Sequence, residues 1–221
     1  MGEWIQLKSS DGFAFSAWRE APEGSSRGGV IVVQEIFGVN HHIRSVVHRF
    51  AASGFVAIAP SLFDRLEPRF EEDYDDSSRA RAFQLMGKFD RALAVQDIAA
   101  AVPTARAGGK VGVVGFCLGG ALAWATSANV PGVDAAVGYY GNIIALKDMK
   151  PKAATMMHFG EKDQHIPVDK VRETAAGFPE VKFYYYPADH GFGCDERASF
   201  DAESSTIAWG RTIEFLAKRL G

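Results

Sequence analysis

Short, continuous apolar runs recur along this chain and constrain its fold more than any other feature of the sequence. They lie at Val30–Val33, Phe55–Ala59, Val111–Val114, Ala135–Tyr139 and Ala153–His158. A strand without polar alternation is buried on both faces, as in a parallel sheet that is covered by helices. Segments with helical spacing separate these runs, so the order of elements predicts an α/β fold.

Three further segments complete the expected sheet. Trp4–Lys8 and Phe13–Trp18 alternate in polarity and flank the turn Ser10-Asp11-Gly12, which predicts an opening antiparallel hairpin. The aromatic run Phe183–Tyr186 adds a strand near the C-terminus. We therefore expect an α/β architecture, a mostly parallel sheet of about eight strands with helices on both faces.

Apolar residues at helical spacing mark the helices between these strands. One stripe comprises Ile43, Val46, Val47 and Phe50; a longer stretch comprises Ala82, Leu85, Phe89, Leu93 and Ile98; the last helix includes Ile207, Ile213, Phe215 and Leu216. The sequence contains no internal repeat and no interdomain linker. Residues 1–221 are therefore expected to form a single domain.

The segment from Pro60 to Ser78 lacks the periodicity of a core element and carries an acidic cluster at residues 71–76. It is longer than most loops of compact domains. A solvated surface excursion is the slightly favoured interpretation of the acidic residues. The alternative is a pocket wall, because open α/β sheets bind ligands at the carboxyl ends of their strands.

Composition narrows the classes of partner. Hydrophobic residues make up 47% and charged residues 23% of the chain, which is typical of a globular protein with a large core. A net charge of −3 gives no overall attraction to nucleic acid or to an acidic membrane surface. The N-terminus lacks the pattern of a secretory signal, and no apolar run approaches the roughly 18 residues of a membrane span. These features predict a cytoplasmic protein that acts on a small molecule.

The first candidate catalytic motif is Gly115-Phe116-Cys117-Leu118-Gly119, where an expected strand runs directly into an expected helix. This is the nucleophile-elbow pattern G-x-S-x-G with cysteine in the place of serine. At the N-terminus of a helix, the dipole and the unpaired N–H groups favour a thiolate. The alternative is that Cys117 is a small buried hydrophobe, as most free cysteines are.

An acid and a histidine follow the elbow, each on a loop after a later strand. Asp163 follows the strand at 153–158, and His190 follows the strand at 183–186. Nucleophile, acid and histidine in this chain order are expected of an α/β-hydrolase triad. His190 would take the thiol proton and deliver it to the leaving oxygen, while Asp163 orients the imidazole.

Other candidates for these roles are weaker. Asp189 adjoins His190 but points away from it on an extended chain, and His165 lies too close to the acid loop. His41 and His42 open a helix and are expected at the surface. We find no spacing of His, Cys or carboxylates typical of a metal site, and no phosphate loop, since neither Lys-Ser nor Lys-Thr follows Gly119-Gly120. No metal and no cofactor are expected.

Nearly the whole chain resembles the dienelactone hydrolase (carboxymethylenebutenolidase) family. The resemblance is carried by the motifs Gln34-Glu35-Ile36-Phe37-Gly38-Val39-Asn40, Gly115 to Ala121, Gly138-Tyr139-Tyr140-Gly141, Gly160 with Asp163 and Pro167, and His190-Gly191-Phe192. It implies a triad of Cys117, Asp163 and His190, and an oxyanion hole formed by the backbone N–H groups of Ile36 and Leu118. It also implies a monomer. In the family, the glutamate at the position of Glu35 lies beside the nucleophile and shifts when substrate binds. A carboxylate in that position disfavours the thiolate by repulsion between like charges.

The same resemblance implies an enol-lactone substrate whose carboxylate is held by arginines. Arg79 aligns with one of them, and the expected substrate-binding residues are Arg79, Phe37, Tyr140, Phe192, Phe83, Met86 and Cys194. The last three depart from the family, which has tyrosine, tryptophan and a second arginine in their places. Arg81 and Arg197 could compensate for that arginine, although each is more readily interpreted as a surface residue.

The expected reaction is therefore hydrolysis of dienelactone to maleylacetate through a cysteine thioester. A broad-range carboxylesterase is the second enzyme hypothesis, because the changed pocket residues remove an anion donor and a hydroxyl. A ligand-binding protein on a hydrolase fold is the hypothesis from another class.

Overall fold

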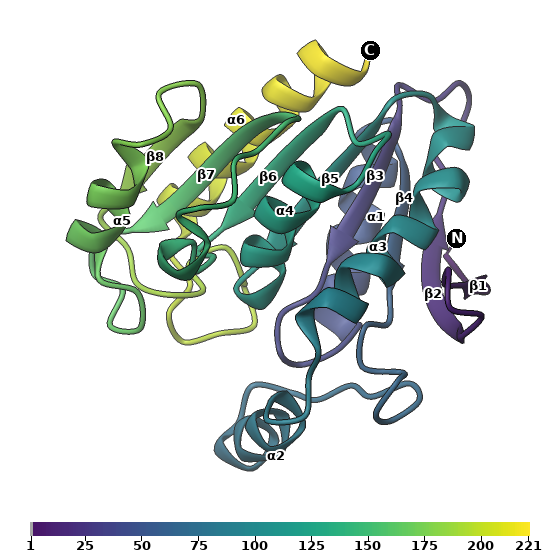
Figure 1. Ribbon diagram of the computed structural model, residues 1–221, viewed down its shortest axis with the longest axis horizontal. Coiled ribbons are helices and arrows are strands. Elements are labelled where there is room, and N and C mark those ends of the chain that lie inside the picture. Colours follow the sequence, from purple (N-terminus) through teal and green to yellow (C-terminus); the bar gives the residue numbers. More distant parts are fainter. Residues whose placement is uncertain (1) are drawn as a thin grey trace.

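A twisted eight-stranded sheet runs through the centre of the computed structural model, which describes residues 2–221 (Figure 1). The strand order is β1-β2-β4-β3-β5-β6-β7-β8. The strands are Glu3–Lys8 (β1), Ala14–Glu20 (β2), Gly29–Val33 (β3), Val56–Pro60 (β4), Val111–Phe116 (β5), Ala135–Tyr139 (β6), Ala154–Gly160 (β7) and Lys182–Tyr186 (β8). β2 pairs antiparallel with β1 and β4, and every other pairing is parallel. The predicted fold class is thus confirmed.

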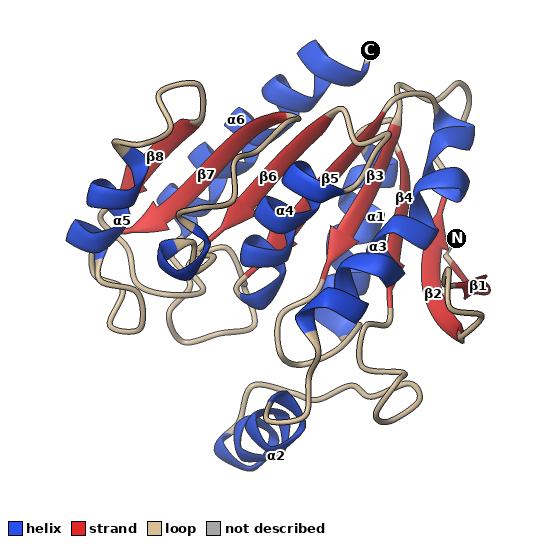
Figure 2. Ribbon diagram, in the orientation of Figure 1, coloured by secondary structure: helices blue, strands red, loops and turns tan. Residues whose placement is uncertain are grey.

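Helices cover both faces of this sheet, as Figure 2 shows. They are His41–Ala52 (α1), Asp76–Met86 (α2), Arg91–Ala105 (α3), Leu118–Asn129 (α4), Val168–Ala175 (α5) and Ala202–Leu220 (α6), with short 3₁₀ turns at Arg106–Gly108 (η1) and Ile144–Leu146 (η2). In Figure 1, α3 and α4 lie in front of the sheet, and α1 and α6 lie behind it.

The central strands contribute to two separate core layers. Val30 and Val32 of β3 pack with α1 and α6, whereas Ile31 and Val33 pack with α3 and α4. Successive side chains of a strand point to opposite faces, so a strand covered on both sides needs apolar residues at every position. This arrangement explains the continuous apolar runs of the sequence.

The single long helical stretch expected over residues 82–98 is wrong, because the chain breaks between α2 and α3. α2 ends at Met86, and the side chain of Asp90 caps α3 by accepting the N–H groups of Ala92 and Leu93. α2 projects beyond the carboxyl ends of the strands (Figure 1) and leaves Phe83 60% exposed. Spacing alone did not show this break, since the apolar positions on either side keep a similar period.

The segment before α2 is in part a solvated surface loop and in part a pocket wall, the two interpretations given for it above. Glu71 is exposed and pairs with Arg44, as a solvated loop would allow. Tyr74 and its neighbours Asp73 and Asp75 line a cavity at the carboxyl ends of the strands. Among residues 2–221, every helix is too short or too polar to cross a bilayer.

Candidate active site

Cys117 occupies the sharp turn between β5 and α4. Its backbone has φ 52° and ψ −113°, a region that residues other than glycine rarely adopt. The flanking glycines are required by space: a Cβ at Gly115 would collide with the carbonyl of Gly119, and a Cβ at Gly119 with the carbonyl of Val33. The turn therefore presents the Cys117 thiol at the N-terminus of α4, beside the N–H groups of the first turn of that helix.

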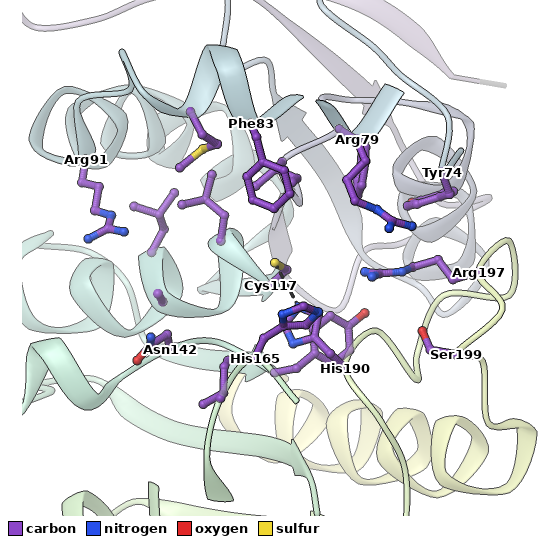
Figure 3. A pocket seen from close by; sticks show the side chains of 18 of the residues that line it. Tyr74, Arg79, Phe83, Arg91, Cys117, Asn142, His165, His190, Arg197 and Ser199 are labelled. Atoms are coloured by element: carbon purple, nitrogen blue, oxygen red, sulfur yellow. Dashed lines mark hydrogen bonds between the residues drawn. The ribbon is translucent and has the colours of Figure 1, made fainter. Parts of the chain in front are cut away.

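His190 and Asp163 complete a hydrogen-bonded relay with this cysteine. The distance from Cys117 Sγ to His190 Nε2 is 3.2 Å, shown as a dashed line in Figure 3, and that from His190 Nδ1 to Asp163 Oδ2 is 2.8 Å. The other oxygen of Asp163 accepts the N–H groups of His165 and Ile166 at 2.8 and 2.9 Å. Both ring nitrogens of His190 and both oxygens of Asp163 are therefore fixed in direction.

The electrostatics of the relay favour a charged imidazole. Burial lowers the pKa of His190, but its hydrogen bonds to Asp163 and Cys117 outweigh burial and raise this pKa to about 10. Burial raises the pKa of Asp163, yet the contacts with His190 bring it below its usual value. A proton that leaves the thiol can thus reside on His190 beside an ionised Asp163.

The other residues near the relay have different surroundings. The Asp189 carboxylate accepts the backbone N–H of His190 at 2.6 Å and makes no hydrogen bond to the ring. The His165 ring packs edge-on against His190, with the centroids 5.3 Å apart, and lines the cavity. Neither residue occupies the position between Cys117 and Asp163.

Two backbone N–H groups of residues that line the cavity have no acceptor within residues 2–221. The Leu118 N–H belongs to the first turn of α4, which has no acceptor within the helix. The Ile36 N–H makes no hydrogen bond with another residue of the described chain. Both residues line the cavity with Cys117, as donors to an oxyanion would.

Glu35 is buried close to this site but does not line the cavity. Its side chain is 1% exposed; one oxygen accepts the hydroxyl of Tyr74 at 2.9 Å, and the other accepts Nη1 of Arg197 at 3.1 Å. Within residues 2–221 it makes no hydrogen bond to the sulfur of Cys117. The structure therefore shows Glu35 paired with Arg197.

The expectation of a surface position for Arg197 is wrong. Its side chain is only 18% exposed, and it lines the cavity as well as pairing with Glu35. A buried carboxylate needs a charged or hydrogen-bonding partner. The need of Glu35 for such a partner could have indicated a buried arginine, but the sequence did not show which arginine pairs with it. Arg81, by contrast, is exposed and pairs with Glu67 and Glu72.

The cavity above the relay has a volume of about 1230 Å³. Five of the expected substrate-binding residues line it: Phe37, Arg79, Phe83, Met86 and Tyr140. In Figure 3, Arg79 and Arg197 point toward one side of the cavity, with Tyr74 beside them. This side of the cavity carries two guanidinium groups and the hydroxyl of Tyr74, which already donates to Glu35.

The expected pocket positions of Phe192 and Cys194 are wrong. Both side chains are fully buried and lie outside the cavity lining. The chain turns after His190, the N–H of Cys194 bonds to the carbonyl of Gly191, and Phe192 packs between Tyr140 and Tyr186. Burial, followed by the charge of Glu35, raises the pKa of Cys194 to about 12, which disfavours its thiolate form.

The expectation that both opening histidines of α1 are surface residues holds for His41 alone. His42 is 1% exposed, and its ring packs edge-on against Phe116 and Tyr74. Its Nδ1 lies 3.3 Å from a carboxylate oxygen of Asp195. Within the described chain, no three His, Cys, Asp or Glu side chains gather as metal ligands would.

A mostly parallel sheet, a nucleophile elbow after β5, and an acid and a histidine on the loops after β7 and β8 define an α/β-hydrolase. Within this class, a sequence model of the dienelactone hydrolase family matches residues 15–220, and the chain belongs to that family. The protein is therefore a hydrolase.

Individual relatives match over almost their full length. Carboxymethylenebutenolidase 1 of Cupriavidus pinatubonensis is 33% identical, with 98% of this chain and 97% of the relative covered. The carboxymethylenebutenolidase of Pseudomonas putida is 34% identical, with 97% and 96% covered. The crystal structure of a Klebsiella pneumoniae protein assigned to the dienelactone hydrolases is similar with a TM-score of 0.85 at 30% identity, covering 99% of each chain.

Proposed function

We propose that this protein hydrolyses an enol lactone such as dienelactone to maleylacetate through a thioester on Cys117. The observation that carries this proposal is the relay of Cys117, His190 and Asp163, with contacts of 3.2 and 2.8 Å. The names of the relatives support the choice of substrate, since they are carboxymethylenebutenolidases. A monomeric, cytoplasmic enzyme without a cofactor remains our prediction.

In the first half of the proposed reaction, the Cys117 thiolate attacks the carbonyl carbon of the lactone. The negative charge moves to the carbonyl oxygen, which accepts the N–H groups of Ile36 and Leu118. Collapse of this intermediate breaks the ring C–O bond, and His190 gives its proton to the leaving enol oxygen. The product is a thioester with the opened chain, and the enol becomes a ketone by moving a proton to carbon.

In the second half, water attacks the thioester while His190 accepts a proton from it. The same two N–H groups hold the oxyanion, and collapse breaks the C–S bond. The acid product leaves, and Cys117 returns as a thiolate beside a protonated His190. Asp163 stays ionised throughout and stabilises the charge of the imidazolium.

A carboxylate on the substrate would face Arg79 and Arg197. Arg79 is half-exposed, and its only ion pair within the described residues is an i,i+3 contact of 3.3 Å with exposed Asp76, so it can turn to a ligand. Arg197 already neutralises Glu35, and acidic Asp73 and Asp75 also line the cavity. Selectivity for an anionic lactone therefore depends mainly on Arg79.

A broad-range carboxylesterase is the second candidate. Phe83 and Met86 give the cavity wall apolar side chains without a hydrogen-bonding group, which favours neutral esters. The complete relay argues against a protein that only binds a ligand, because such a protein needs no oriented histidine between an acid and a thiol.

The test is a spectrophotometric assay with cis- and trans-dienelactone beside p-nitrophenyl acetate. We expect a higher kcat/KM for a dienelactone, loss of both activities in Cys117→Ala, and retention in Cys194→Ala, whose thiol lies outside the cavity. Hydrolysis of only the neutral ester would favour the carboxylesterase. The absence of any turnover in folded enzyme would favour a binding protein.

A further inference from the structure

The cavity extends beyond the relay along one face of α4. Its lining includes Cys117, Ala121, Ala125 and Asn129, which are four residues apart and so lie on one side of the helix. At a rise of about 1.5 Å per residue, the distance along the axis from the nucleophile to Asn129 is about 18 Å. The cavity therefore extends from the relay along the length of α4.

Apolar side chains from three other elements form the remaining walls of this space. Met86 of α2 and Val95 of α3 line one side, and Leu146 and Met149 line the other, at and after η2. We call the space between them and α4 the α4 groove. Its floor is kept open by the small side chains of Ala121 and Ala125.

The two directions from Cys117 differ in chemistry. Figure 3 shows Arg79 and Arg197 on one side of Cys117, whereas Arg91 lies on the other side, beyond apolar side chains. The cationic side suits a carboxylate, while the α4 groove offers mostly methyl and thioether surface. One substrate could occupy both directions only if it carried an apolar extension.

The volume of the cavity also indicates a substrate larger than dienelactone. About 1230 Å³ exceeds the roughly 300–1,000 Å³ of pockets that hold drug-sized ligands. A small lactone such as dienelactone would leave the α4 groove unfilled. Filling it with apolar atoms is favourable because each buried methylene contributes to binding.

We propose that the α4 groove is a substrate subsite for an alkyl chain or aromatic ring attached to the ester or lactone. The proposal rests on the proposed function, because it assumes that the scissile carbonyl lies at Cys117. It assigns to this enzyme lactones and esters with an extended apolar arm.

The test compares kcat/KM across two ester series, p-nitrophenyl esters from acetate to octanoate and alkyl acetates from methyl to octyl. A fully buried methylene corresponds to about fourfold in kcat/KM, so partial burial predicts a rise of at least about tenfold across one series. Values that stay flat or fall in both series, in enzyme that hydrolyses the acetates, would overturn the proposal.

Filling the groove provides the matched variants. Ala125→Phe should lower kcat/KM for the longest ester at least about tenfold more than for the shortest, because the new ring occupies the path of the chain. Val95→Phe narrows the groove from the opposite wall and should act in the same direction. The control is Ala202→Phe, at an exposed position at the start of α6, which should leave the length profile unchanged.

Equilibrium binding separates failure of the subsite from failure of the proposed reaction. We expect octanoate to bind Cys117→Ala at least about tenfold more tightly than acetate in calorimetry, and Ala125→Phe in the same background to remove that preference. This result would support the groove even if no ester were turned over. Equal binding of the two carboxylates would contradict it, whatever the activity of the enzyme.

Discussion

Arg197 Nη1 donates a hydrogen bond of 3.1 Å to the carboxylate of Glu35, and the two residues are 162 positions apart in the chain. Glu35 is 1% exposed, and Tyr74 binds its second oxygen. The pair joins the loop after β3 to the loop after His190. It thus links the loop that carries Ile36 to the loop that carries His190.

Removal of Arg197 should therefore destabilise the fold strongly. Arg197→Ala leaves a buried carboxylate without its cation, and loss of one partner of a buried pair typically costs about 3–5 kcal/mol. The free energy of unfolding from urea titration measures this. Glu35→Gln added to Arg197→Ala should recover part of the loss, and Arg81→Ala, which breaks only exposed pairs, should cost about 0–1 kcal/mol. Strictly additive effects of Glu35→Gln and Arg197→Ala would contradict a coupled pair.

Arg79→Ala should discriminate between substrates by charge. The side chain lines the cavity and has one weak, exposed partner, so it is available to a substrate carboxylate. Loss of a charge-assisted contact predicts a decrease of about 1.5–3 kcal/mol in transition-state stabilisation for a carboxylated lactone only. Steady-state kcat/KM for that lactone and for a neutral ester gives the comparison. Equal losses on both substrates would show that Arg79 does not bind the carboxylate.

Tyr140→Phe tests a hydroxyl that the described chain leaves without a partner. The Tyr140 side chain is fully buried, its ring centroid lies 5.1 Å from that of His190, and its Oη has no hydrogen bond. Deleting an unsatisfied buried hydroxyl should raise the free energy of unfolding by about 1 kcal/mol. We also expect this hydroxyl to donate to bound substrate, so kcat/KM should fall in the same variant. Lower stability with full activity would contradict both expectations.

His158 should make the fold sensitive to acid. Burial, followed by the nearby charge of Arg211, lowers the pKa of His158 to about 3, and its ring nitrogens contact Tyr186 and Thr212. The unfolded value is about 6.5, so between roughly pH 6.5 and 3 the unfolded chain binds a proton that the folded protein does not. Stability is therefore lost as the pH falls through this window, by at most about 5 kcal/mol.

The corresponding variant is His158→Phe. It should be less stable at pH 7, because Tyr186 and Thr212 lose a partner, but its free energy of unfolding should fall less steeply between pH 6.5 and 4. Urea titrations at several pH values provide the measurement. An identical acid slope in the two proteins would assign the acid sensitivity to other groups.

The sheet and the relay could be predicted from sequence because their signals are local. Burial on both faces produces apolar runs such as Val30–Val33, and the elbow requires glycines on either side of Cys117 at fixed spacing. The loops carrying Asp163 and His190 converge because the carboxyl ends of parallel strands share one edge.

The surroundings of the relay were less predictable because they depend on side-chain directions set by tertiary packing. Cys194 lies four residues after His190, yet a turn directs it into the core, while Arg197 three residues later lines the cavity. His42 follows an exposed histidine but faces Phe116 from the buried side of α1. Spacing along the irregular loop after His190 carries no information on which side chain faces the cavity.

Mass spectrometry of the enzyme, quenched in acid during turnover, tests the thioester on Cys117 most directly. With p-nitrophenyl esters of slowly deacylating acids, we predict an adduct with the mass of the acyl group, located on the peptide that contains Cys117 and absent from Cys117→Ala. The adduct should disappear on treatment with neutral hydroxylamine, as a thioester does. Turnover with no adduct on Cys117, or an adduct on another residue that persists in Cys117→Ala, would contradict the proposed mechanism.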